Sequence, residues 1–90
     1  MDNQTTRRHA ALVDRMATAL GRDLEEDVIK ARLDLDTLHD MVVRCTGCTK
    51  PGDCEHFLAR TEASGQPASD TPAYCRNAAT FRLLNAGQRT

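Results

Sequence analysis

The chain has 90 residues and a formal net charge of −1, with 12 basic against 13 acidic residues. This length suits one small domain, and the balanced charge gives no whole-chain attraction for nucleic acid or an anionic membrane. With one Tyr, two Phe and no Trp, the core must be mostly aliphatic, so a cross-link or a bound metal would help to stabilise it.

The first predicted helix runs from about Thr6 to Leu20 and ends at Gly21, which supplies a stop signal. Residues 1–5 are expected to fray. The apolar residues of this segment recur with helical spacing on one face. They are Leu12, Val13, Met16 and Leu20.

Two capping signals follow. Asp23 and Glu26 form a capping pair for a short second helix, with Leu24, Val28 and Ile29 as its apolar face. Asp34 is expected to cap a third helix over residues 35–44, which Gly47 ends. The buried face of that helix is expected to hold Leu35, Leu38, Met41, Val42 and Cys45.

The second half of the chain predicts two more helices. One covers about residues 53–60 and carries Cys54, Phe57 and Leu58, and the polar stretch 61–71 is predicted to be a flexible loop. Thr71-Pro72 then favours a helix start, so a last helix is expected over about 73–84, before a frayed tail at 87–90. The fold class is therefore all-α, a single small domain (1–90) of four to five short helices joined around a four-cysteine site.

The four cysteines follow the spacing Cys45-x2-Cys48-x5-Cys54-x20-Cys75. No signal peptide or membrane span is visible, so a cytoplasmic location is expected. In a reducing compartment clustered cysteines indicate metal binding or redox chemistry before structural disulfides. We therefore expect Cys45, Cys48, Cys54 and Cys75 to form one site.

The identity of the bound group has three alternatives: a [4Fe-4S] cluster, a structural Zn²⁺ ion, or disulfides and free thiols. The cluster is favoured because zinc sites with four cysteines often use two C-x2-C pairs, and this chain has one. Cys54 and Cys75 are expected near helix starts, where backbone N–H groups favour thiolates. No catalytic residue is predicted, and a thiol redox enzyme using Cys45 and Cys48 is a weaker hypothesis because no βαβ pattern accompanies the pair.

The loop around the first three cysteines resembles a known iron–sulfur loop. Its sequence is CTGCTKPGDCEHF, and it is similar to the [4Fe-4S] loop of endonuclease III-type DNA glycosylases, which has C-x6-C-x2-C-x5-C. The first family cysteine would fall at Leu38, so Cys75 would have to replace that ligand. The resemblance implies ligation by Cys45, Cys48 and Cys54 and carries no glycosylase activity, since the family's catalytic motifs are missing.

A broader stretch resembles a family of small, uncharacterised bacterial proteins known as a domain of unknown function. The matching segments are RMATALGRDLEEDVIKARLDLDTLHDMVVRCTGC, CEHFLA and PAYCRNAATFRLL. Relatives tend to carry Trp at the position of Phe57. This resemblance implies that the four cysteines act together, and it implies no activity.

Other chemistry-bearing residues have simpler interpretations. His56 could be an alternative ligand but is expected to be a partly exposed side chain. His39, with Asp36 and Asp40, is expected on a solvated face, and His9 on the surface. No protein partner, oligomeric state or nucleic-acid partner can be named from these residues.

Charged residues lie near the ends of the predicted helices and beside the cysteines. The acidic run of Asp23, Glu25, Glu26 and Asp27 suits the positive end of a helix dipole better than a calcium site. Arg44, Lys50 and Arg76 flank the cysteines and could offset the negative charge of a metal–thiolate centre.

Overall fold

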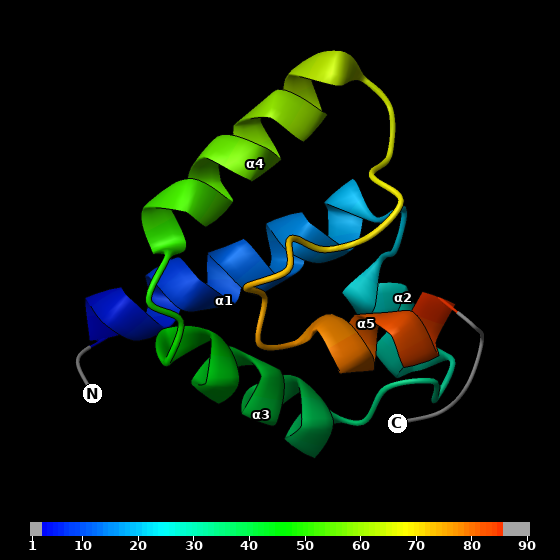
Figure 1. The fold of residues 1–90 in the computed structure, drawn as a ribbon. Coiled ribbons are helices and arrows are strands. Elements are labelled where there is room, and N and C mark those ends of the chain that lie inside the picture. The colour runs from blue at the N-terminus through cyan, green and yellow to red at the C-terminus, as the bar shows by residue number, and fades with distance from the viewer. Residues whose placement is uncertain (1–2, 86–90) are drawn as a thin grey trace.

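The computed structural model describes residues 3–85 as five helices. Within that range no strand occurs, so the all-α prediction is confirmed. The helices are α1 (Asn3–Ala19), α2 (Leu24–Ile29), α3 (Leu35–Thr46), α4 (Pro51–Ser64) and α5 (Ala78–Asn85). Figure 1 shows α1 at the centre, with α3 on one side of it and α4 on the other, while α5 lies beside α2.

The end of α1 follows the predicted stop. Gly21 has φ 79°, and the N–H groups of Gly21 and Arg22 donate to the carbonyls of Thr18 and Ala17 at 2.9 and 2.8 Å. This pair of bonds is a Schellman motif, in which a residue with positive φ closes the helix. The predicted termination at Gly21 is confirmed.

The two capping predictions are also confirmed. The backbone N–H of Glu26 donates to the Asp23 carboxylate at 3.2 Å, and that of Thr37 donates to Asp34 Oδ1 at 2.7 Å. Each carboxylate satisfies an N–H group that has no partner inside its helix. These hydrogen bonds fix where α2 and α3 begin.

Several predicted helix boundaries differ from the structure. Helix α1 begins at Asn3, so residues 3–5 are helical, and the expectations for residues 1–2 and 87–90 lie outside the described residues. Helix α4 runs from Pro51 to Ser64 and ends at Gly65, which has φ 71°. The predicted loop 61–71 therefore begins four residues late, because a polar sequence without a breaker continues the helix as far as that glycine.

The largest difference is the start of the last helix. Residues 73–77 form turns, and α5 begins at Ala78, not near Ala73. The side chain of Asn77 is buried and donates Nδ2 to the Met41 carbonyl of α3 at 2.8 Å. This long-range bond holds the segment before α5 against α3, and it overrides the local start signal at Thr71-Pro72.

The hydrophobic core lies where α1, α3, α4 and α5 meet. The apolar face predicted for the first helix is buried as expected, and Met41, Leu58, Phe81 and Leu84 join it from the other helices. Two predicted core residues are instead exposed: Ile29 (76%) and Leu35 (68%). His9, predicted on the surface, is buried, and its Nδ1 donates to the Thr5 carbonyl at 2.9 Å.

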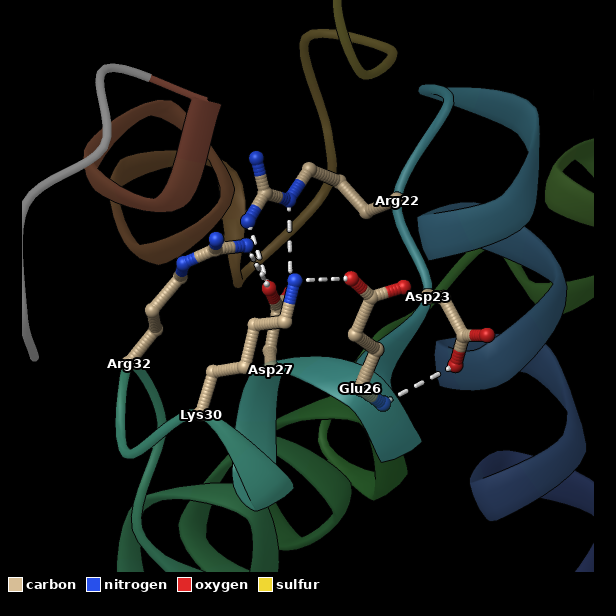
Figure 2. A network of polar contacts seen from close by, with 6 residues as sticks. All are labelled: Arg22, Asp23, Glu26, Asp27, Lys30 and Arg32. Atoms are coloured by element: carbon tan, nitrogen blue, oxygen red, sulfur yellow. Dashed lines mark hydrogen bonds and ion pairs between the residues drawn. The ribbon is translucent and has the colours of Figure 1, made fainter.

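Helix α2 ends in a charged network that the sequence did not reveal. Asp27 is 2% exposed, and Figure 2 shows Arg22 and Arg32 converging on its carboxylate. Arg22 donates to both carboxylate oxygens at 2.6 and 3.3 Å, and Arg32 approaches at 3.4 Å. Beside this buried network, Lys30 and Glu26 form an ordinary exposed pair at 2.7 Å.

Two ion pairs link α1 to α4. Arg8 contacts Glu55 at 2.7 Å and Arg15 contacts Glu62 at 2.9 Å. From the first ion pair to the second, the residue number increases by seven, or about two helical turns, on each helix. The two helices therefore run in the same direction. Helix α3 therefore leads the chain back along α1 before α4 begins (Figure 1).

These ion pairs predict a pH dependence of stability. The hydrogen bond from Arg8 lowers the pKa of Glu55, and that from Arg15 lowers the pKa of Glu62. A carboxylate whose folded pKa is depressed contributes stability above its unfolded pKa and loses it as pH falls through the folded pKa. We expect Arg15→Gln to destabilise the protein slightly at neutral pH and to have a smaller effect in acid, at about pH 2, because protonation of Glu62 removes the ion pair.

Urea denaturation at the two pH values measures this difference. Arg60→Gln is the matched control, because Arg60 is exposed on the same helix as Glu62 and has no ion pair among the described residues. An Arg15→Gln effect that persists unchanged in acid would contradict the assignment.

Candidate four-cysteine site

The four cysteines come from three separate parts of the chain. Cys45 lies in the last turn of α3, Cys48 lies in the connection to α4, and Cys54 lies at the start of α4. Cys75 lies in the turns before α5, not inside a helix as predicted. Cys54 is buried and the other three are half-buried.

The C-x2-C segment is shaped by the end of α3. The N–H of Gly47 donates to the Arg44 carbonyl, and that of Cys48 donates to the Cys45 carbonyl, both at 3.0 Å. These bonds continue the helical path for one more turn and bring Cys45 and Cys48 onto neighbouring positions. The backbone N–H of Lys50 then donates to the Cys48 sulfur at 3.4 Å.

Electrostatic coupling shows that the four sulfurs are close enough to affect one another. Burial, together with the charges of Cys54, Cys48 and Cys75, raises the pKa of the Cys45 thiol to about 12. Burial likewise raises the pKa of Cys54 to about 11, with Cys75 and Cys48 contributing. The fold therefore gathers thiols that are up to 30 residues apart in sequence, and it keeps Cys45 and Cys54 as neutral thiols at physiological pH.

The surroundings of Cys75 act on its pKa in both directions, and the net effect is to raise it. Burial raises the pKa of this thiol, while a hydrogen bond from the backbone of Asn77 opposes the rise. The Thr71 hydroxyl also lowers the pKa of Cys75. Oγ1 of Thr71 is buried and has no other hydrogen-bond partner in the described part of the chain, so this hydroxyl is free to donate to a charged sulfur.

Basic side chains stand near the site, but only some of those predicted. A Cβ built on Gly47 would lie 3.5 Å from Nε of Arg76, so this guanidinium packs on the C-x2-C turn. Arg15 of α1 lowers the pKa of Cys54, a contribution that sequence spacing could not indicate. Arg44 instead donates to the Thr80 hydroxyl of α5 at 3.3 Å.

The arrangement is a set of free thiols. All four cysteines are free, and among residues 3–85 no group of three or more His, Cys, Asp or Glu side chains stands as a ready-made metal site. Binding of one ion or cluster by all four would require the thiols to lose their protons and the side chains to converge.

Histidines and carboxylates do not add to this group. His56 is exposed on α4, two residues from the buried Cys54, so the two residues point to different sides of the helix. His39, Asp36 and Asp40 are exposed on α3, as predicted. The acidic run beginning at Asp23 serves α2 through capping and ion pairs.

Comparison with known proteins places the chain in a family. A family model described as "Family of unknown function (DUF6455)" matches residues 1–87. The chain belongs to the DUF6455 family. No curated protein and no solved structure matches it. The resemblance of the cysteine loop to endonuclease III-type glycosylases therefore stays a prediction from local spacing.

Within the described part of the chain, no helix has the length and apolar character needed to cross a membrane.

Proposed function

We propose that this DUF6455 chain is a small metal-binding protein whose cysteines 45, 48, 54 and 75 together hold a [4Fe-4S] cluster, serving electron transfer, redox sensing or partner regulation. The observation that supports the proposal is that the charges of the other cysteines raise the pKa values of Cys45 and Cys54, so the sulfurs from three parts of the chain lie near one another. Four buried or half-buried thiols with such coupling favour a shared cation, since their thiolates repel one another without it.

Hydrogen-bond donors around the sulfurs support a cluster in particular. The reduction potential of an iron–sulfur cluster is tuned by hydrogen bonds to its cysteine sulfurs and by nearby charge. The Lys50 N–H donates to the Cys48 sulfur. The backbone of Asn77 and the side chain of Thr71 lower the pKa of Cys75. Arg76, packed on the C-x2-C turn, places positive charge at the site.

A purely structural Zn²⁺ site is the second candidate, in a protein-interaction module. Four thiolates complete a tetrahedral zinc site without any further ligand. The domain has a small core with few aromatic residues, and a metal that joins α3, α4 and the segment before α5 would stabilise it. In this case the metal contributes to folding and performs no chemistry.

Protein prepared without oxygen from its native host distinguishes the two candidates. We expect about four iron and four sulfide per chain and a visible absorption band that reduction bleaches. Colourless protein with no iron and sulfide contradicts the cluster. About one zinc per chain, with unfolding by a chelator, assigns the structural site instead.

Single substitutions test which residues hold the group. Cys75→Ser is expected to lose most of the bound iron, because Cys75 supplies one of four ligands. His56→Ala is the matched control, and its iron content is expected to equal that of the unmodified chain, since four thiolates leave no place for the exposed imidazole. Circular dichroism of both variants verifies that each remains helical. Full iron retention in Cys75→Ser would remove Cys75 from the proposed site.

A further inference from the structure

A second surface of the molecule has the character of a binding site. A groove with a volume of about 450 Å³ lies between α1, α2 and α3. We call it the α1–α2–α3 groove; its aliphatic lining includes Val28, Ile29, Leu35, Leu38 and Val42, and two carboxylates, Asp14 and Glu25, complete it. Its volume falls within the range of about 300–1,000 Å³ that is typical of ligand sites.

The groove contains the most exposed large apolar side chains of the described chain. Ile29 is 76% exposed at the end of α2, and Leu35 is 68% exposed at the start of α3. The sequence pattern predicts both as core residues, yet the fold leaves them in water on the same groove. Clustered apolar side chains of this kind mark interaction surfaces more often than scattered ones do.

The charge of the groove indicates which kind of partner it would bind. Asp14 and Glu25 are exposed, and neither forms an ion pair with any residue that the structure describes, whereas five other carboxylates do. A second copy of this chain docked face to face would bring the same two carboxylates together, and like charges oppose such a contact. An apolar surface with unpaired acidic groups instead complements an apolar segment that carries Lys or Arg.

The position of the groove between three helices also indicates the conformation of the bound segment. Residues 3–85 contain no strand to which an extended peptide could add. An apolar groove between helices suits an amphipathic helix that inserts residues spaced i, i+3 or i+4, and i+7. We propose that the α1–α2–α3 groove binds a basic amphipathic helix of a partner protein. This site is independent of any metal bound by the cysteines.

Two synthetic peptides test the proposal with the full chain. One carries Leu at i, i+3, i+4 and i+7 with Lys at the flanking positions, and the other has Glu in place of every Lys. Fluorescence anisotropy is expected to show saturable binding of the Lys peptide and at least about tenfold weaker binding of the Glu peptide. Equal binding of both peptides, or none of the Lys peptide, would overturn the proposal.

Variants locate the binding surface. Leu35→Ser is expected to weaken binding of the Lys peptide at least about tenfold, and Asp14→Asn combined with Glu25→Gln is expected to reduce its dependence on salt. Leu83→Ser is the matched control, because Leu83 is an exposed leucine (42%) outside the groove. An equal loss in the control refutes the assignment to the groove. Sedimentation that reveals a dimer abolished by Leu35→Ser assigns the surface to a second copy and also refutes the proposal.

Discussion

Asp27→Ala is expected to lower the free energy of unfolding by about 3–5 kcal/mol. The Asp27 carboxylate is 2% exposed and receives hydrogen bonds from Arg22 and Arg32. Arg22 is itself only 17% exposed, so removal of the carboxylate leaves a guanidinium in a poorly solvated position without its counter-charge. The cost comes from that unpaired cation more than from the lost attraction.

The neighbouring exposed pair provides the control for Asp27→Ala. Lys30 and Glu26 are 53% and 49% exposed, so Lys30→Gln is expected to change stability by no more than about 0.5 kcal/mol. Both variants alter one charge on the same short segment (Figure 2), and urea denaturation followed by circular dichroism compares them. Similar effects in the two variants would show that burial does not increase the contribution of the Asp27 ion pairs to the free energy of unfolding.

Local signals in the sequence were enough to predict the end of α1 and the starts of α2 and α3. Gly21, Asp23 and Asp34 each act on backbone groups within five residues, and short-range hydrogen bonds of this kind leave a clear pattern. The end of α2 lacks such a pattern. Ala31 has φ 58°, and the N–H of Arg32 donates to the Asp27 carbonyl at 2.8 Å, so an alanine occupies the position where a Schellman motif usually has glycine.

Features that depend on distant contacts could not be predicted. Asn77 bonds a carbonyl 36 residues away, and this contact delays the start of α5 and moves Cys75 into a turn. Arg15 influences Cys54 across two helices. The cysteine spacing predicts one shared site, and that stays a prediction; the donors and charges around the sulfurs arise from tertiary packing, which spacing does not encode.

Substitution of Phe81 in α5 is also expected to destabilise the protein strongly. Phe81 is 1% exposed and packs in the core, so Phe81→Ala is expected to cost about 3–5 kcal/mol through lost burial and the cavity that remains. Helix α5 has eight residues, too few to be stable in isolation. Its position therefore depends on Phe81 and Leu84, and the segment that carries Cys75 depends on α5.

The same substitution tests how α5 affects the cysteine site. In metal-free protein, Phe81→Ala is expected to increase the alkylation rate of Cys75, measured by mass spectrometry of timed samples, because the turns before α5 lose their support. Leu83→Ala is the matched control on the same helix; Leu83 is 42% exposed, so a loss below about 1 kcal/mol and an unchanged alkylation rate are expected. Faster alkylation of Cys75 in both variants, or in neither, would show that the packing of Phe81 does not control access to this thiol. A rate increase confined to Phe81→Ala would establish that the hydrophobic core, through α5, limits access to Cys75.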